Sequence, residues 1–235
     1  MTASLRLHYA PDNASLIVRL ALEELGLPYE TILVDRSQRA QQQPAYLRLN
    51  PNGTIPALAT PDGVIFETAA ILLWLADRSG QLAPAPQDPN RGDMLKWLFW
   101  CSNTLHIDLR QSFYPEKFIG ADPAHQHQLR AVLRQRLQSD LRILEAALIE
   151  TPALSGQAQP TLFDLYLPCL MRWCKLYAET PGQPWFDITA YPALYALCLR
   201  AERRASTRAA QQAEGLGPTP FTAPKLATPP EGSAT

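Results

Sequence analysis

The spacing of apolar side chains changes part-way along the chain and divides the sequence into two kinds of structure. In the first part, Leu5, Leu7 and Tyr9 recur with a period of two, which predicts a strand over 5–9. Apolar residues of 14–25 recur at helical spacing and stop at Gly26, which predicts a helix. The same reasoning predicts strands at 29–34, 55–58 and 64–66 and a helix at 68–77. Residues 1–78 are therefore predicted to form a small α/β domain.

After residue 92 the apolar pattern is helical throughout. Residues 79–92 are rich in Pro, Gly and polar residues, which predicts a linker. An all-helical domain is predicted over 93–214, with helices at 93–114, 124–149, 161–178 and 191–205. Residues 215–235 are rich in Pro, Thr and Ala, with Phe221 as their single aromatic residue, so we expect a mobile or loosely draped tail.

The composition argues against several classes of partner, but it does not identify one. The formal net charge of −1 gives no electrostatic reason to expect a nucleic acid or an anionic membrane. No apolar run is long enough for a membrane span, and the N-terminus lacks the pattern of a secretory signal. The 4 cysteines form no CxxC motif, which favours reduced thiols in the cytoplasm over a disulfide framework or a metal site.

Two short motifs point to a family. The segment Gly53-Thr54-Ile55-Pro56 precedes a predicted strand, and Glu67-Thr68 opens a predicted helix. In this order, after a strand–helix–strand pattern, they resemble the glutathione-binding half of the cytosolic glutathione transferases. The helical remainder resembles the second domain of that family, so the resemblance covers residues 4–205. It implies a thioredoxin-like α/β N-terminal domain followed by an all-α C-terminal domain.

The resemblance also implies how glutathione would bind. The Ile55–Pro56 bond would be cis, and the N–H and C=O groups of Ile55, beside Thr54, would pair with the extended glutathione backbone. Thr68 and the first N–H groups of its helix would bind the γ-glutamyl carboxylate, and Glu67 the ammonium. The structural alternative is that Thr68 only caps its helix and Pro56 only shapes a turn.

At the other end of glutathione this sequence departs from its relatives. Many of them place His or Lys where Gln41 and Gln42 stand, to meet the glycine carboxylate. A glutamine such as Gln42 can hydrogen-bond but cannot pair charge. The affinity for glutathione is therefore expected to be modest, or the preferred thiol to differ.

The turn Pro11-Asp12-Asn13, between the first strand and the first helix, is the expected place of the glutathione thiol. It most resembles the bacterial beta class, whose cysteine falls on Ala14 here. The donors that remain for the thiolate are the Asn13 amide, the Ser15 hydroxyl and the Tyr9 hydroxyl. Each has an alternative role, because Asn13 or Ser15 can cap the helix and Tyr9 can belong to the core.

The segment Thr104-Leu105-His106 resembles a helix of the beta class whose histidine faces the thiol, which makes His106 a further catalytic candidate. A lone histidine can also be an ordinary surface or core residue. The expected family pattern has asparagine where this chain has Phe99. This region also contains four aromatic residues that suggest an apolar wall for a second substrate: Phe99, Trp100, Phe113 and Tyr114.

The first hypothesis is a glutathione transferase of the detoxification type, with glutathione as co-substrate, no metal, a small hydrophobic electrophile and a homodimeric assembly. The alternatives are a non-catalytic protein that binds glutathione or a hydrophobic ligand, and a glutathione-dependent disulfide reductase or peroxidase. The missing cysteine and the two glutamines favour the first alternative. In the helical part, Thr161 and Asp164 are spaced as a capping box with a structural role.

Overall fold

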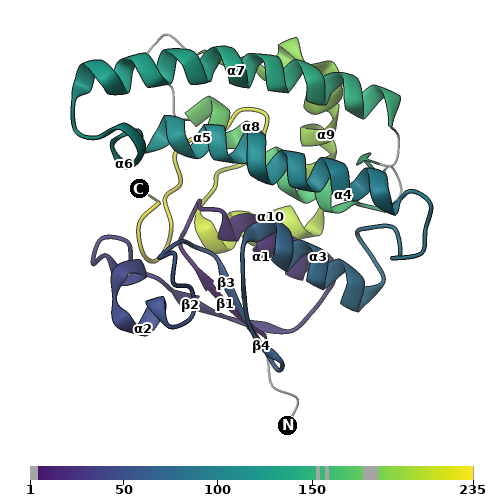
Figure 1. The fold of residues 1–235 in the computed structure, drawn as a ribbon. Coiled ribbons are helices and arrows are strands. Elements are labelled where there is room, and N and C mark those ends of the chain that lie inside the picture. Colours follow the sequence, from purple (N-terminus) through teal and green to yellow (C-terminus); the bar gives the residue numbers. More distant parts are fainter. Residues whose placement is uncertain (1–4, 152–153, 157–158, 177–184, 235) are drawn as a thin grey trace.

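The structure is a computed structural model that describes residues 5–151, 154–156, 159–176 and 185–234. A four-stranded sheet with flanking helices forms the first part, and helices stand above it (Figure 1). The chain therefore has an α/β thioredoxin-like N-terminal domain followed by an all-α C-terminal domain. This confirms the predicted fold class.

The sheet has the order β2-β1-β3-β4. Strand β1 is parallel to β2 and antiparallel to β3, and β3 and β4 form the predicted hairpin. The third strand begins after Pro56 rather than at residue 55, because proline has no N–H for the ladder. The strands are β1 (Leu5–Tyr9), β2 (Tyr29–Leu33), β3 (Ala57–Thr60) and β4 (Gly63–Phe66).

Helices α1 and α3 pack against the sheet, and a longer set forms the second domain. The N-terminal helices are α1 (Ser15–Glu24), the 3-10 turn η1 (Ala40–Gln42), α2 (Pro44–Leu47) and α3 (Thr68–Ser79). The C-terminal helices are α4 (Arg91–Trp100), α5 (His106–Phe113), α6 (Glu116–Ile119), α7 (Pro123–Glu150), α8 (Leu162–Leu176), the 3-10 turn η4 (Ile188–Ala190), α9 (Pro192–Glu202) and α10 (Ala205–Glu214).

The predicted helix over 93–114 is divided. A π-helical segment, η2 (Cys101–Leu105), separates α4 from α5 and ends immediately before His106. Such insertions are frequent at functional sites.

The predicted capping box at the start of α8 is present, since the Thr161 N–H donates to Asp164 Oδ2 at 2.8 Å.

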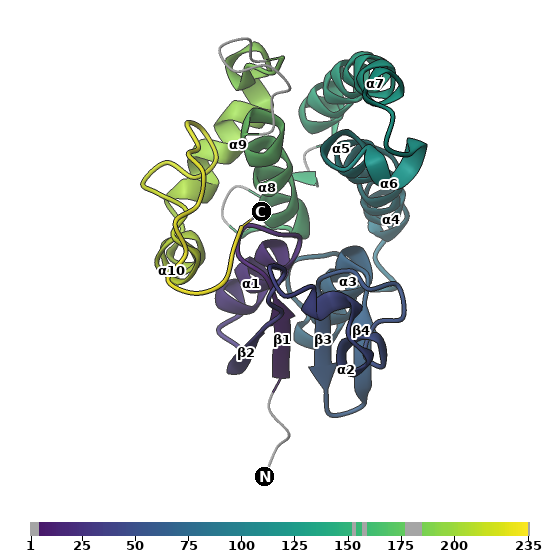
Figure 2. The ribbon, with the colours of Figure 1, turned by 90° about the vertical axis from the view of Figure 1, so that its left-hand side faces the viewer.

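One apolar core joins the two domains. Leu16 and Leu20 of α1 and Leu165 of α8 belong to the same cluster of buried side chains. Helix α10, which follows the predicted helix over 191–205 and was not itself predicted, lies along α1 (Figure 2). The N-terminal domain is therefore held in place by burial against the helical one.

The prediction of a mobile or loosely draped tail is corrected by the structure. After α10, residues 215–234 loop beside α9 and α10, and the chain ends near α8 (Figure 2). Leu216 and Phe221 are buried, and Gly232 approaches Leu33 so closely that an added Cβ would lie 2.7 Å from its Cδ1. The tail composition is poor in apolar residues, but two apolar anchors and hydrogen bonds to its carbonyls are enough to pack it.

Among the described residues, no helix combines the length and apolar character needed to cross a membrane. The same residues contain no group of three or more acidic, His or Cys side chains placed to hold a metal ion. All four cysteines are buried free thiols.

Candidate functional site

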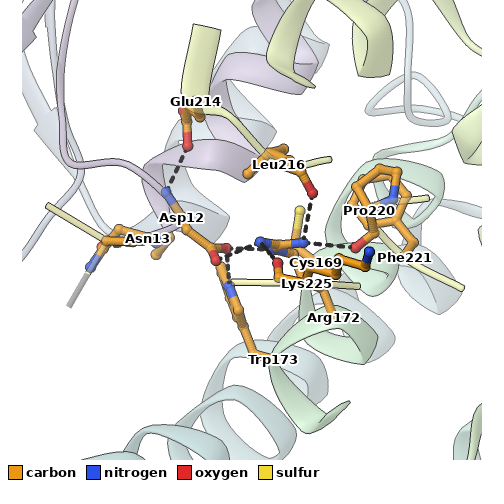
Figure 3. A network of polar contacts seen from close by, with 12 residues as sticks. Asp12, Asn13, Cys169, Arg172, Trp173, Glu214, Leu216, Pro220, Phe221 and Lys225 are labelled. Carbon is orange, nitrogen blue, oxygen red and sulfur yellow. Dashed lines mark hydrogen bonds and ion pairs between the residues drawn. The ribbon is translucent and has the colours of Figure 1, made fainter. Parts of the chain in front are cut away.

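The turn between β1 and α1 is fixed from inside the protein. Asp12 has a left-handed backbone with φ 49° and points its carboxylate inward. Arg172 of α8, which is fully buried, donates to it through Nε at 2.7 Å and Nη2 at 2.8 Å (Figure 3). Trp173 Nε1 donates to the same carboxylate at 2.9 Å, and Glu214 of α10 accepts the Asp12 N–H at 2.8 Å. The helical domain thus sets the position of this turn.

The same guanidinium also holds the tail. Arg172 donates to the carbonyls of Leu216, Pro220 and Lys225 at 2.9–3.4 Å (Figure 3). A buried arginine needs several acceptors, and here one carboxylate and three carbonyls supply them. The turn and the tail therefore share one buried cation.

The three predicted thiol donors lie in different places. Asn13 points away from the Asp12 network and lines a pocket (Figure 3). Its Oδ1 accepts the Ala14 N–H at 2.8 Å, so its Nδ2 is directed elsewhere. The Ser15 side chain is fully buried, and its hydroxyl donates to the Ala10 carbonyl at 2.9 Å. Tyr9 is buried and hydrogen-bonded to Glu231 of the tail. Only Asn13 of these three faces the pocket.

The cleft between the domains has two lobes that share Ala14, Thr54, Ile55, His106 and Arg110. We name them after one residue of each. The Thr68 lobe adds Asn52, Pro56, Glu67, Thr68, Ala69, Ser102, Ile107 and Tyr166. The Arg36 lobe adds Asp12, Asn13, Arg36, Gln41, Gly53, Phe113, Tyr114, Lys117 and Trp173.

The Thr68 lobe contains the residues of the two sequence motifs. The Ile55–Pro56 bond is cis, and no described residue hydrogen-bonds to the N–H or C=O of Ile55. Glu67 has φ 72° and precedes α3, and within the described chain no side chain caps this helix. The first N–H groups of α3 beside Thr68 are thus available to a carboxylate.

The Arg36 lobe corrects the prediction for the two glutamines. Of the two glutamines, Gln41 lines it, whereas Gln42 is exposed outside both lobes. Gln41 Oε1 is buried and has no hydrogen-bond partner among the described residues. Both glutamines belong to η1, where Gln42 is exposed and Gln41 is half-buried, so sequence position alone could not choose between the pair.

Two of the four aromatic residues that were expected to line the cleft do so. Phe113 and Tyr114 line the Arg36 lobe, and Trp173 joins them from α8. Phe99 is exposed away from the cleft, and Trp100 packs edge-on against Trp97. The π-helical segment η2 lies between Phe99–Trp100 and Phe113–Tyr114. Because it interrupts the regular α-helical spacing, the two pairs need not face the same side.

Comparisons with known proteins agree with this geometry. The family model described as "Glutathione S-transferase, N-terminal domain" matches residues 14–78. A ternary complex of BphK, a bacterial GST, is 31% identical, covers 90% of this chain and 100% of that chain, and gives a TM-score of 0.74. The chain belongs to the cytosolic glutathione transferase superfamily.

Two further relatives of this glutathione transferase differ in what they are described to do or hold. The disulfide-bond oxidoreductase YfcG of Escherichia coli is 29% identical over 195 residues, which cover 80% of this chain and 85% of that protein. A glutathione transferase from Burkholderia graminis, solved with two glutathione molecules bound per subunit, is 26% identical. That structure covers 91% of this chain and 90% of its own, with a TM-score of 0.72.

His106 of this transferase lies where the two lobes meet. Its Nδ1 is 2.8 Å from the hydroxyl of Tyr166, which is buried in α8. The Tyr166 hydroxyl has no other hydrogen-bond partner among the described residues, and where it donates to Nδ1 the ring proton lies on Nε2. Burial and the nearby charge of Arg110 lower the pKa of His106 to about 4. The ring is therefore neutral at physiological pH and offers an N–H donor.

Several residues at the site were missed from the sequence, and the charged ones Arg172 and Arg36 show why. Arg172 stands within the apolar run of α8, and a charged residue in such a run signals a buried ion pair. Arg36 stands three residues after the end of β2 and carries the charge that the glutamines lack. Both residues stand out in the sequence, but the sequence does not indicate which residues they contact.

Proposed function

We propose that this transferase binds glutathione along both lobes of the cleft and activates its thiol for attack on a small electrophile. The observation that carries the proposal is the uncapped start of α3, with Thr68 and Glu67 beside it, at one end of a cleft. The γ-glutamyl carboxylate would accept from the Thr68 hydroxyl and the α3 N–H groups, and Glu67 would accept from the ammonium.

The rest of glutathione would extend from this end toward the Arg36 lobe. The free N–H and C=O groups of Ile55 suit pairing with the cysteinyl backbone, as in strand addition. The glycine end would then lie near Gln41 and Arg36, where a cation can pair with its carboxylate. Gln41 Oε1, which has no hydrogen-bond partner in the described part of the chain, can accept a peptide N–H.

Thiol activation needs a donor for the thiolate, since a free cysteine thiol has a pKa near 8.5. Asn13 Nδ2 is such a donor, and the start of α1, which has no side-chain cap within the described residues, adds the positive end of the helix dipole. His106, which lines both lobes, would offer its Nε2–H to the same region. The thiol proton leaves to solvent, the sulfur forms a bond to the electrophilic carbon, and the leaving group departs with its electron pair.

The test is conjugation of glutathione with chlorodinitrobenzene, followed together with the pKa of the bound thiol by thiolate absorbance. Asn13→Ala is expected to raise that pKa and to lower kcat/KM by about tenfold or more, because one donor to a developing anion is lost. Asn90→Ala, an exposed asparagine before α4, is the matched control. A loss in Ser15→Ala with none in Asn13→Ala would contradict this choice of donor.

A second candidate function is reduction of disulfides by glutathione, and one observation favours it besides the similarity to YfcG. All four cysteines are buried, so both sulfurs would come from glutathione. One glutathione thiolate would attack a glutathione mixed disulfide, forming oxidised glutathione and releasing the other thiolate. The Burkholderia relative holds two glutathione molecules per subunit, which supports room for such a pair. Reduction of hydroxyethyl disulfide tests this activity.

Glutathione binding without turnover of either substrate would instead support the non-catalytic alternative. A homodimer and a cytoplasmic location stay predictions, which sedimentation and fractionation test.

A further inference from the structure

The Arg36 lobe carries an excess of positive charge. Arg36, Arg110 and Lys117 line it, and Asp12 is the one carboxylate among its described lining residues. Both oxygens of Asp12 already accept from Arg172, and one of them also from Trp173. The carboxylate is therefore neutralised from behind the pocket, and the three cations keep their charge toward the cleft.

Aromatic rings contact these three cations at the Arg36 lobe. The Arg36 Nη2 donates to the Tyr114 hydroxyl at 2.7 Å, and Lys117 Nζ lies 4.2 Å from the centre of the Tyr114 ring. The Arg110 guanidinium lies 5.8 Å from the centre of the Phe118 ring. Such contacts orient a cation but leave its charge uncompensated.

The cations act on one another. Burial and the charges of Arg110 and Arg36 lower the pKa of Lys117, against the opposing effect of Glu116. Holding like charges at one pocket costs free energy, and an anion placed between them would recover it.

The three cations are not equally available. Arg36 already donates to the Tyr114 hydroxyl and to the Ala234 carbonyl of the tail. Arg110 of α5 and Lys117 of α6 form no ion pair with any described carboxylate and are exposed to the cleft. Phe113 and Trp173 line the same lobe and offer an apolar wall.

We propose that the second substrate of this enzyme is an anionic electrophile, whose acid group pairs with Arg110 and Lys117 while its apolar body packs on Phe113 and Trp173. The inference rests on the proposed function, since it places this substrate beside the glutathione thiol. It replaces a purely hydrophobic electrophile by one that carries a carboxylate or a similar acid group.

The experiment compares two electrophiles that differ by one carboxylate, chlorodinitrobenzene and chlorodinitrobenzoate. The ratio of their kcat/KM values, each divided by its uncatalysed rate, is expected to favour the carboxylate. Arg110→Gln and Lys117→Gln should each lower this ratio by about five- to tenfold, as expected for loss of a charge-assisted contact. Lys96→Gln, a lysine of α4 outside the cleft, is the matched control and should leave the ratio unchanged.

A wild-type ratio that does not favour the carboxylate overturns the inference while leaving the transferase activity in place. So does a Lys117→Gln variant that raises only the KM for glutathione, because the cation would then serve the glycine carboxylate.

If neither electrophile is turned over, the proposed transferase activity fails, and binding still decides the inference. S-(carboxybenzyl)glutathione should bind more tightly than S-benzylglutathione in calorimetry, and equal binding overturns the inference. Absence of binding by both conjugates overturns the glutathione site itself and the inference with it.

Discussion

The two lobes of the cleft are assembled in different ways. Just over half of the Thr68 lobe, including both sequence motifs, comes from residues 52–69, a short stretch in which a loop, a hairpin and a helix start follow one another. The Arg36 lobe gathers residues from the β1–α1 turn, the loop after β2, α5, α6 and α8, and the tail lies at its edge. The motif residues of the Thr68 lobe are close together in the sequence, whereas the residues of the Arg36 lobe are brought together by tertiary packing.

This difference assigns different tasks to the lobes. A local lobe keeps its geometry when the rest of the molecule changes, which suits a ligand common to many proteins, such as the end of glutathione. An assembled lobe changes shape and charge with each helix that contributes to it, which suits the variable second substrate. The following substitutions test whether the lobes are separable in this sense.

The largest effect is expected for Arg172→Met, which leaves the Asp12 carboxylate buried without its cation and three tail carbonyls without a donor. Breaking a buried pair in this way costs about 3–5 kcal/mol in free energy of unfolding. Urea unfolding measures it, with Arg208→Met at an exposed position of α10 as control. Under conditions where the variant is folded, glutathione affinity should fall much less than turnover does.

A loss of stability below about 1 kcal/mol would contradict the role of this pair. An equal loss of glutathione affinity and turnover would show that the lobes are not separable.

The next effect in size is expected for Thr68→Ala at the local lobe. It removes a hydroxyl from the start of α3, and a hydrogen bond to a charged group contributes about 1.5–3 kcal/mol. The Kd for glutathione in calorimetry should therefore rise about tenfold or more, with the unfolding free energy little changed. Thr68→Ser restores the hydroxyl and should restore the affinity. An unchanged Kd in Thr68→Ala would leave Thr68 with a structural role only.

The local lobe is also the part that could be predicted from the sequence. Ile55, Glu67 and Thr68 lie in a fixed order around a hairpin, so their neighbourhood follows from chain connectivity. The division into an α/β part and a helical part followed equally from the change of apolar period.

The assembled lobe could not be predicted, because its residues meet only through packing. Ser15 and Asn13 are two positions apart, yet the start of α1 turns Ser15 into the core and Asn13 toward the cleft. The tail composition predicted little packing, yet Arg172 binds its carbonyls from a helix far away in sequence. Hydrogen bonds between distant segments leave no periodic signal.

The last effect is spread over a range of pH and concerns His106, which belongs to both lobes. Its pKa is lowered from 6.5 to about 4 by burial and by Arg110, so the unfolded chain binds a proton that the folded one does not between these pH values. The free energy of unfolding should therefore fall as the pH falls from 6.5 to about 4, by at most about 1.4 kcal/mol per pH unit from this residue. Urea unfolding across that range should show the slope, and His106→Gln should flatten it. His125→Gln, at an exposed position of α7, is the matched control, and an equal flattening there would contradict a special environment for His106.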